Sequence, residues 1–576
     1  QRQRRGPRPT VIPDADYEDN APWPGPRPGD RELPPRETRS VFPGADQEHL
    51  HGLLGRLPNG ELRVPPTPLP QGGLSQDEKS LAHRGQCYNA RASDATSIDR
   101  HQPDKRSSRC KELHHEYTTA PLPSASVVMV FHNEVLSALL RSVQSVLNHS
   151  PPHLLDEVIL IDDASEVDND RFSEEQLRHL QQGVDEYISH LPKVRMARMG
   201  ERRGLMLARM EGVWRASSEV AIFLDSHIEA TPGWIEPLLA RIRDDPRKVV
   251  VPTIDSIDFD SMRFGGNSGL GVLGFTWTLG QKPQYATDTH KPQPSPIMPG
   301  GLFAGHRKFF LHLGGYDPGM RYYGGEEMEI GFRTWQCGGE IEYVSCSHVF
   351  HIFRNAAYWQ GTNSAGVAYK VPGGDITRNK LRAAAVWMDD WNKLVQYASP
   401  PLPAGWDLGD IESRSALRQK LQCKSFEWYL KNVAKGMFYP EIRGLRAGSL
   451  ENPQLRGCLD TLGGHEMGVY PCHGQHGTQG LVMDGDGLLR LPILMYDSCL
   501  TAQGGVGRPL RLAKCPGKSP GQEFRWLLDE TSGAFRSGNG LCLEAVDKAT
   551  AKSPMTLSLS ACKPDSAAQK WKWSGW

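Results

Sequence analysis

The chain has 576 residues, and its 66 Lys and Arg are balanced by 67 Asp and Glu, for a formal net charge of −1. This length allows roughly two to four domains of about 150 residues, and the balanced charge argues against a general nucleic-acid binder and against an acidic solvating protein. No stretch approaches the ~18 uninterrupted apolar residues of a membrane-spanning helix and no signal-peptide pattern opens the chain, so from its first residue, a Gln, we expect a trimmed or mature form.

Proline is concentrated in the first 75 residues, in runs such as 21–26 and 64–68. Proline at this density removes backbone donors and blocks helices. We therefore interpret residues 1–84 as an extended, Pro-rich stem or tether. A spacer with no chemistry of its own is favoured over a binding motif.

Short apolar runs begin at residue 126 and alternate with helical patterns. Continuous runs of four to six residues occur at 126–131, 158–161 and 220–224. Apolar residues between 139 and 147 recur at helical spacing. Such runs are typical of strands buried on both faces of a parallel sheet, which predicts the α/β class. Ligands bind beyond the carboxyl ends of such strands, and two of the runs deliver Asp163 and Asp225 to that edge.

A histidine follows the acidic residue that ends the third run. Asp225 and His227, two apart at a strand end, point the same way. A carboxylate with an imidazole suits a borderline divalent ion such as Mn²⁺, although an isolated Asp-x-His is more often a surface or capping pair. A later stretch supplies His348 and His351. On a strand these two histidines face opposite sides, so we expect only one of them to ligate a metal.

Glycine pairs stand beside polar groups in two further segments, 299–303 and 323–329. Glycine lets the backbone approach a ligand closely, but two tight turns are the simpler interpretation. The three glutamates of the second segment open a predicted helix that runs through Trp335. Three acids are more than the helix dipole needs as complements.

The C-terminal part contains a threefold repeat whose glutamines, at 479, 522 and 569, are spaced 43 and 47 residues apart. A steady period of this length is a fold signature, and turn residues between short apolar pieces predict all-β units. Each repeat supplies two cysteines at a similar offset, which suggests one disulfide per repeat and an oxidising compartment. Because there are eleven cysteines, at least one thiol is left over, and Cys87 is our candidate.

Ordered motifs between residues 85 and 576 match those of one protein family. They comprise VFHNE at 130–134, RRGL at 202–205, DSH at 225–227, GGLF at 300–303, GGE at 324–326, WQCGG at 335–339, HIFR at 351–354, VWMD at 386–389 and the three C-terminal repeats. With these motifs the chain resembles the polypeptide N-acetylgalactosaminyltransferases, which start mucin-type O-glycosylation.

The resemblance implies an α/β GT-A (Rossmann-like) catalytic domain over 85–432, a linker over 433–450 and an all-β, ricin-type β-trefoil lectin domain over 451–576. The implied activity is retaining transfer of GalNAc from UDP-GalNAc to Ser or Thr hydroxyls of proteins, with Mn²⁺ as cofactor and a lectin domain that binds prior GalNAc. The expected partners are protein or glycoprotein acceptors, the UDP-sugar and a GalNAc-glycopeptide, with no nucleic acid. The expected location is the Golgi lumen, as a type II membrane protein whose anchor is absent from this chain.

The family's pattern also implies roles for individual residues. Asp225, His227 and His351 would hold the metal. Catalytic roles would fall on Asp225, Glu326, Glu327 and Arg354. Contacts to the UDP-sugar would come from Asp163, Arg202, Asp225, Ser226, Gly301, Tyr323, Glu326, Arg354 and Tyr369. In the lectin domain, the first repeat would bind sugar with Asp460, Tyr470, His473 and Thr478.

Phe353 and Phe275 are expected to line the groove for the acceptor peptide. With the resemblance in hand, we expect five disulfides: Cys110–Cys346, Cys337–Cys423, Cys458–Cys472, Cys499–Cys515 and Cys542–Cys562.

The sequence departs from the family pattern at several of these positions. Tyr323 replaces a Trp, and Glu327 replaces an amide, so that a carboxylate could stabilise a developing oxocarbenium ion or attack it. A Glu327 side chain turned to solvent is the favoured alternative. The segment between Arg354 and Tyr369, which matches a mobile loop over UDP, is longer than usual.

The three lectin repeats differ in the residues that would contact a sugar. A sugar pocket needs an acidic acceptor, which the second and third repeats lack in its usual form because they carry Thr501 and Glu544. Thr478 replaces the usual Asn in the first repeat. The first repeat is therefore the best candidate for binding sugar, and the other two are expected to be structural.

Two alternatives to an active GalNAc-transferase remain open. One is a catalytically impaired, GalNAc-binding lectin-like protein, against which the retained Asp225–His227–His351 set weighs. The other is a GT-A enzyme with another UDP-sugar donor.

Overall fold

The computed structural model describes residues 17–33, 67–70, 73–168, 171–189, 191–269, 271–284, 290–355, 371, 373–435, 446–463, 467–474, 477–491, 498–503, 505–507, 510–516, 520–546 and 555–575. The chain divides into two compact units. The first comprises residues 1–273, 283–379 and 410–424, and the second comprises 274–282, 380–409 and 425–576.

The first unit is built on an eleven-stranded sheet. Its main path runs in the order β1-β4-β3-β2-β5-β12-β7-β13-β11, with β6 paired to β13 and β8 paired to β7. The strands are β1 (Arg31–Leu33), β2 (Ala125–Phe131), β3 (Leu155–Asp162), β4 (Val194–Arg198), β5 (Val220–Asp225), β6 (Ile228–Ala230), β7 (Lys248–Ile257), β8 (Phe264–Asn267), β11 (Gln293–Pro294), β12 (Phe303–His306) and β13 (Glu340–Ile352). The three apolar runs at 126–131, 158–161 and 220–224 form β2, β3 and β5, which pair in parallel as predicted.

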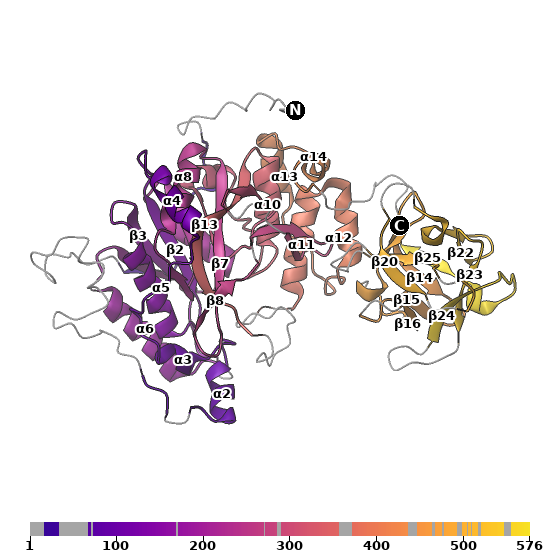
Figure 1. Ribbon diagram of the computed structural model, residues 1–576, viewed down its shortest axis with the longest axis horizontal. Helices are drawn as coiled ribbons and strands as arrows, with labels where there is room; N and C mark the ends of the chain where they lie inside the picture. The colour runs from indigo at the N-terminus through magenta and orange to yellow at the C-terminus, as the bar shows by residue number, and fades with distance from the viewer. Residues whose placement is uncertain are drawn as a thin grey trace, which may run out of the picture. The chain divides into compact units, whose positions relative to one another are not determined.

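Helices cover this sheet, with α5 and α6 to one side of the central strands and α10 to the other in Figure 1. They are α2 (Gln76–His83), α3 (Ala90–Asp94), α4 (Ser108–Tyr117), α5 (Leu136–His149), α6 (Glu174–Ile188), α7 (Leu205–Arg215), α8 (Ile235–Asp244), α9 (Arg307–His312), α10 (Glu326–Gln336) and α13 (Glu412–Lys420). The helical spacing read at 139–147 lies in α5, and the predicted acidic helix is α10. This mixed α/β architecture confirms the predicted fold class of the first unit.

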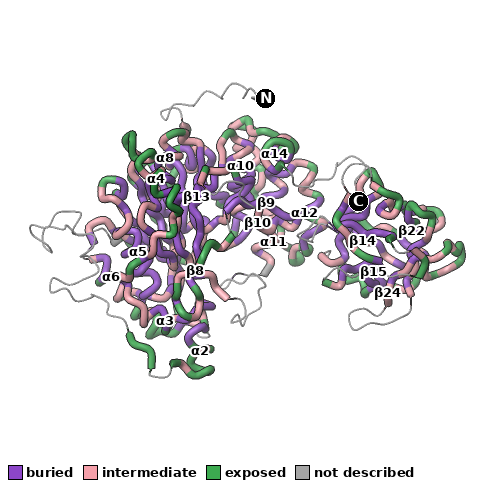
Figure 2. The backbone as a smooth tube through the Cα atoms, in the orientation of Figure 1, coloured by how far each residue is buried: buried purple, intermediate pink, exposed green. Residues whose placement is uncertain are grey.

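The core of the first unit lies between the sheet and α5. Val127 and Met129 of β2, Leu160 of β3 and Leu139 of α5 belong to one cluster of buried apolar side chains. Figure 2 shows β13 buried along most of its length, whereas α2 is largely exposed. Burying each such side chain contributes about 1.5–3 kcal/mol, so the strands that end at the ligand edge are firmly held.

Residues 17–33 differ from the expected spacer. Arg31–Leu33 form β1, which pairs antiparallel with β4 at the edge of the sheet, in the register Arg31↔Arg198 and Leu33↔Met196. The physical reason is that an edge strand presents unpaired backbone groups that an extended segment can satisfy. The rest of the expected stem, apart from 67–70 and 73–84, lies outside the described residues.

The second unit contains a twelve-stranded antiparallel sheet that curls on itself, as in a β-trefoil. Its strands are β14 (Arg446–Asn452), β15 (Gly457–Asp460), β16 (Gly468–Pro471), β17 (Leu481–Met483), β18 (Leu489–Arg490), β19 (Ser498–Thr501), β20 (Arg511–Lys514), β21 (Trp526–Asp529), β22 (Ala534–Ser537), β23 (Cys542–Val546), β24 (Met555–Ser560) and β25 (Lys572–Gly575). The three repeat glutamines each lie in a short 3₁₀ turn, η5 (Gly477–Gln479), η6 (Gln522–Phe524) and η7 (Ala567–Gln569). The all-β repeats are confirmed.

The second unit also takes in residues that we expected in the catalytic domain. These are 274–282, 380–409 and 425–432, which include α12 (Asn392–Ala398) and α14 (Phe426–Asn432). The physical reason is packing: α12 contacts β14, and a Cβ at Gly480 would lie 3.0 Å from the Tyr397 backbone oxygen. The helix α11 (Gly373–Trp387) is divided between the two units, and most of the expected linker lies outside the described residues.

Five disulfides are formed, and they are the five expected pairs. Two lie in the first unit, Cys110–Cys346 and Cys337–Cys423. One lies in each lectin repeat, Cys458–Cys472, Cys499–Cys515 and Cys542–Cys562. Cys87 is the free cysteine, and it is buried. Within the part of the chain that the structure describes, no helix has the length and apolarity needed to cross a bilayer.

Candidate active site

Three side chains with metal-ligand chemistry converge at the carboxyl edge of the first sheet. Asp225 ends β5, His227 follows it, and His351 is near the end of β13; one ligand atom from each lies within 4.8 Å of the other two. His351 Nε2 lies 3.2 Å from Asp225 Oδ2. His348 faces away, with its Nδ1 2.7 Å from Asp255, so only one of the two histidines joins the cluster. One carboxylate and two imidazoles form a donor set that fits a borderline divalent ion.

A buried glutamate, Glu134, orients His227 of the cluster. Its Oε2 accepts hydrogen bonds from His227 Nδ1 at 2.8 Å, from Ser226 Oγ at 2.9 Å and from the Arg354 guanidinium at 3.3 Å, while Tyr88 donates to Oε1 at 2.7 Å. Burial alone would raise the pKa of Glu134, but these partners outweigh it and lower the pKa to about 2. With Nδ1 protonated toward this carboxylate, the Nε2 of His227 is left for a metal.

A buried arginine, Arg209 of α7, holds the carboxylate of the cluster. Its guanidinium donates to Asp225 Oδ1 at 3.1 Å, to the backbone oxygens of Gly300 and Gly301 at 2.5 and 2.8 Å, and to the Tyr316 hydroxyl at 3.0 Å. Burial opposes ionisation of Asp225, yet His351 and Arg209 hold its pKa well below its usual range. A Cβ at Gly301 would lie 2.7 Å from Asp225 Oδ2, so this position admits only glycine without a shift of the carboxylate.

Sequence reasoning assigned no role to Glu134 or Arg209. Glu134 ends the VFHNE motif at 130–134, which was the available signal for it. Arg209 lies inside a helix with no motif around it, and only the sheet topology brings it to Asp225. Both are therefore additions that the structure makes to the predicted site.

The segment after β4 is fastened to the end of β3 by Asp163. The two carboxylate oxygens of Asp163 accept hydrogen bonds from the backbone N–H groups of Arg203 and Gly204, at 2.7 and 2.8 Å. Burial raises the pKa of Asp163 in spite of these bonds. The guanidinium of Arg202 lies over the ring of Tyr322, 5.1 Å from its centroid. Asp163 and Arg202, both predicted to contact the donor, thus lie on two neighbouring segments that hydrogen bonds join.

The glycine pair at 324–325 leads into α10, where Gly325 caps the helix in the left-handed region at φ +87°. Glu326, the first residue of the helix, is buried, and its Oε2 makes no hydrogen bond. Burial, reinforced by the charge of Glu327, raises the pKa of Glu326 to about 8. Glu327 is half-buried, and a Cβ at Gly300 would lie 3.2 Å from its Cβ.

The remaining predicted residues of the catalytic domain fall in different places. Tyr323 is half-buried before the glycine pair, and Phe353 is half-buried with its ring centroid 4.6 Å from that of His351. Phe275, expected in the acceptor groove, is instead a core residue of the second unit. Its ring is only 1 % exposed and packs against aromatic residues that include Trp277. Tyr369, with the rest of the expected loop over UDP from residue 356, lies outside the described residues.

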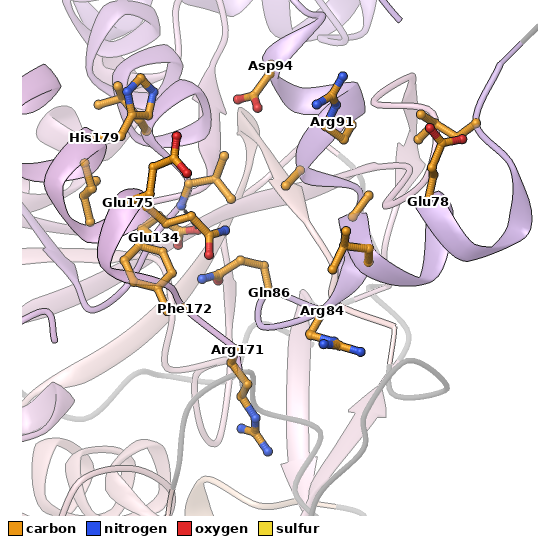
Figure 3. A pocket seen from close by; sticks show the side chains of 18 residues that line it. Glu78, Arg84, Gln86, Arg91, Asp94, Glu134, Arg171, Phe172, Glu175 and His179 are labelled. Carbon is orange, nitrogen blue, oxygen red and sulfur yellow. Dashed lines mark hydrogen bonds between the residues drawn. The ribbon is translucent and has the colours of Figure 1, made fainter. Parts of the chain in front are cut away.

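A cavity of about 550 Å³ lies on another side of Glu134 (Figure 3). Figure 3 shows Arg91 and Asp94 of α3 and Glu175 and His179 of α6 around it. None of the three residues of the metal-type cluster (Asp225, His227 and His351) lines this cavity. Arginines and carboxylates both line the cavity, so its charge favours no single class of ligand.

In the second unit, the first lectin repeat assembles a polar site around Asp460. Asp460 Oδ2 accepts hydrogen bonds from Thr478 Oγ1 at 3.2 Å and from Gln479 Nε2 at 3.0 Å. His473 lies 3.4 Å from Thr478 Oγ1, and Tyr470 is 45 % exposed on β16. Two of the other predicted sugar-binding residues, Thr478 and His473, therefore lie beside the Asp460 carboxylate, and Tyr470 is on the neighbouring strand.

The third repeat shares a backbone hydrogen bond of the first repeat but not the surroundings of its carboxylate. In the third repeat, Gln569 accepts from the Lys563 backbone N–H at 2.7 Å, as Gln479 does from His473 at 3.1 Å. The acid of that repeat, Glu544, lies 3.9 Å from the ammonium of Lys563 instead of receiving a glutamine amide. The second repeat has Thr501 at this position.

Comparisons with known proteins agree with this arrangement. The family model described as Glycosyl transferase family 2 matches residues 126–314, the N-terminal domain of galactosyltransferase matches 284–355, and the ricin-type beta-trefoil lectin domain matches 446–571.

Relatives and one solved structure match most of the chain. A "Probable N-acetylgalactosaminyltransferase 9" of Caenorhabditis elegans is 35 % identical, over 93 % of this chain and 93 % of its own length. The human "Polypeptide N-acetylgalactosaminyltransferase 13" is 40 % identical, over 71 % of this chain and 72 % of its own length. A crystal structure of GalNAc-T7 with UDP, GalNAc and Mn²⁺ is 28 % identical and superposes with a TM-score of 0.68, covering 100 % of this chain and 99 % of that one.

Proposed function

The chain belongs to the polypeptide N-acetylgalactosaminyltransferase family, and we propose that it transfers GalNAc from UDP-GalNAc to Ser or Thr hydroxyls of proteins with retention of the anomeric configuration. The observation that carries this proposal is the convergence of Asp225, His227 and His351 at the carboxyl edge of the sheet. In the reaction, the bond from the sugar C1 to the UDP oxygen breaks and a bond from C1 to the acceptor oxygen forms. The hydroxyl proton passes to the leaving diphosphate oxygen.

Asp225, His227 and His351 would hold Mn²⁺. When bound, Mn²⁺ would supply positive charge against the negative charge of the leaving diphosphate. Glu134 fixes the orientation of His227, and Arg209 fixes that of Asp225. Glu134 and Arg209 thereby preorganise the site, because groups already held in place need no rearrangement when charge develops.

The donor sugar and nucleotide are assigned to the loops around this cluster. Residues of the nucleotide side are Asp163, Arg202, Ser226, Arg354 and Tyr369. Residues of the sugar side are Gly301, Tyr323, Glu326 and Glu327. With its pKa raised to about 8, Glu326 keeps its proton near neutral pH and can donate a hydrogen bond to a sugar hydroxyl. Phe353, beside His351, is the acceptor-side candidate that the geometry supports.

The proposed ligand of the lectin domain is a GalNAc residue that is already attached to the acceptor. Asp460, held by Thr478 and Gln479, presents a carboxylate for sugar hydroxyls, and the exposed ring of Tyr470 offers an apolar face for stacking. His473 completes the site. The five disulfides agree with an oxidising lumen, and we place the protein in the Golgi, as a type II membrane protein in its full-length form.

The test is transfer from UDP-GalNAc with Mn²⁺ to paired naked and GalNAc-bearing Thr peptides, with the products read by mass spectrometry. UDP-GlcNAc and a chelator serve as controls. We expect transfer from UDP-GalNAc alone, lost on chelation and restored by Mn²⁺. Binding of UDP without transfer to either peptide would overturn the proposal in favour of a lectin-like protein. Equal transfer from UDP-GlcNAc would overturn the donor assignment.

A further inference from the structure

Residues 17–33 form an N-terminal strap that lies along the first unit. At its beginning, the ring of Tyr17 packs on Phe309 and His312 of α9, with centroids 5.5 and 5.3 Å apart. Asn20 Nδ2 then donates to the His312 backbone oxygen at 2.6 Å. At its end, the strap becomes β1 and pairs with β4. A segment fixed at both ends belongs to the fold and is not a free spacer.

The middle of the strap is seated on α7. Trp214 Nε1 donates to the Ala21 backbone oxygen at 2.7 Å, and the guanidinium of Arg215 lies over the ring of Trp23, 5.0 Å from its centroid. Arg215 Nε also donates to Glu32 at 2.8 Å. The same helix carries Arg209, so the strap and the candidate active site share a supporting element.

Two glycines bring the strap into close contact with the segment after β4. A Cβ at Gly200 would lie 2.7 Å from the Pro28 backbone oxygen and 2.8 Å from the Gly29 Cα. Gly29 itself has φ +87°, in the region that favours glycine. Backbone meets backbone here, which only glycines on both sides permit.

The side chain of Asp30 lies where the strap and the segment after β4 meet. Its carboxylate accepts hydrogen bonds from the Gly200 backbone N–H at 2.9 Å and from the Arg203 guanidinium at 2.7 Å, and its other oxygen accepts from the Arg27 backbone N–H at 2.9 Å. The side chains of Asp30 and Arg203 are 1 and 2 % exposed. Breaking a buried ion pair by removing one partner is costly, because the other charge is then left uncompensated.

Arg203 carries this constraint to the donor-side loop. Its backbone N–H and that of Gly204 donate to the two oxygens of Asp163. Its side chain also donates to Glu211 of α7 at 2.9 Å. Arg202, assigned to the donor, is the residue before it. Two aspartates therefore hold the loop at 200–204. Asp30 bonds the Gly200 backbone and the Arg203 side chain, and Asp163 bonds the backbone of Arg203 and Gly204.

We propose that Asp30 is a positioning residue for donor binding, and that through it the N-terminal strap fixes the 200–204 loop, which carries Arg202 and is bonded to Asp163, for the binding of UDP. This inference rests on the proposed function for the identity of the ligand. Asp30 touches only the protein and acts through Gly200 and Arg203. Residues in a stretch with the composition of a stem thereby become part of the donor site's support.

The test compares Asp30→Asn with Glu18→Gln in the full chain. Glu18 is the matched control, because it is also an acidic strap residue in an ion pair, with Lys420 at 2.7 Å, but it does not touch the 200–204 loop. Three quantities are measured: the Kd of UDP with Mn²⁺ by calorimetry, kcat and KM for UDP-GalNAc, and hydrogen exchange of the 200–204 amides. For Asp30→Asn we expect a roughly tenfold weaker UDP complex, a matching rise in KM, faster exchange in the loop and kcat within about twofold of wild type.

Unchanged UDP affinity and unchanged exchange in Asp30→Asn would overturn the inference, as would equal changes in Glu18→Gln. If Asp30→Asn fails to fold, Asp30→Glu carries the test, because it keeps the charge and displaces it by one methylene. A wild-type chain that binds UDP but transfers no GalNAc would overturn the proposed function while leaving the comparison of Kd values intact.

Discussion

Two sites in this chain place a carboxylate at the end of a strand, and they differ in what holds it. Asp225 ends β5 and is held by a buried cation, Arg209, and by a histidine from β13. Asp460 ends β15 and is held by neutral groups, Thr478 and Gln479, from one turn of its own repeat. The first site is assembled over long distances in the sequence and depends on charge, whereas the second is local and depends on neutral hydrogen bonds. Substitutions should therefore have larger effects at the first site.

The largest expected effect comes from removing a ligand of the metal-type cluster. His227→Ala leaves Asp225 and His351 without their third partner, so we expect kcat/KM for GalNAc transfer to fall by at least about 10³-fold, or roughly 4 kcal/mol of transition-state stabilisation. Steady-state kinetics over a range of Mn²⁺ concentrations measures it. GalNAc binding by the second unit serves as the control and should not change. Activity within tenfold of wild type would remove this cluster from the mechanism.

The next effect separates orientation from ligation. Glu134→Gln keeps the shape but removes the charge that orients His227, and we expect activity to fall by about 10–100-fold and the Kd of Mn²⁺ to rise. The matched control is Glu157→Gln, since Glu157 also accepts several hydrogen bonds, from Ser126, Ser217 and Arg195, but lies near the start of β3. Equal losses in both variants would show a general effect on folding instead.

The contrast between the two sites also explains what the sequence could predict. The buried strands and the repeat glutamines were found because short apolar runs and a steady period are visible along the chain. Asp225 and His227 were found because they follow such a run directly. Arg209 was missed because its contact with Asp225 exists only once α7 has packed on the parallel sheet, and nothing in the helix sequence marks it.

Composition gave a wrong expectation at the N-terminal strap. Proline-rich sequence predicts an extended segment, and residues 17–33 are extended, but extension alone does not tell whether a segment pairs with a sheet edge. A three-residue strand such as β1 is too short to show alternation. Phe275 is the opposite case, because it was expected to line an exposed groove and is instead buried in an aromatic core.

A third prediction concerns Glu326 and the pH dependence of stability. The pKa of Glu326 is raised from 4.5 to about 8 by burial and by Glu327, so between these values the folded chain keeps a proton that the unfolded chain releases. The free energy of unfolding therefore falls as pH rises from 5 to 8, and Glu326→Gln should remove most of this pH dependence. Denaturant unfolding at several pH values measures the slope. Glu174→Gln on the exposed face of α6 should keep the wild-type slope; a slope unchanged in Glu326→Gln would contradict the prediction.

A smaller effect is expected at the lectin site. Asp460→Ala removes the carboxylate that sugar hydroxyls would reach, so transfer to GalNAc-bearing peptides should fall by roughly fivefold to tenfold, with transfer to naked peptides unchanged. The control is Glu544→Ala in the third repeat, whose carboxylate faces Lys563. Equal losses on both kinds of peptide would indicate that the lectin domain does not guide the acceptor.

The smallest effect on kcat is expected for Glu327→Gln, which tests the chemistry of the first site. A carboxylate that attacked the sugar would be indispensable, so Glu327→Gln would then lower kcat by several powers of ten. The structure favours a lesser role: Glu327 is half-buried and lies against Gly300, while its neighbour Glu326 occupies the buried position. We therefore expect kcat within about twofold of wild type, a change below ~0.4 kcal/mol. Because Glu327 raises the pKa of Glu326, the same substitution should also lower that pKa, so a pH–rate profile that shifts while kcat holds would assign Glu327 to tuning its neighbour.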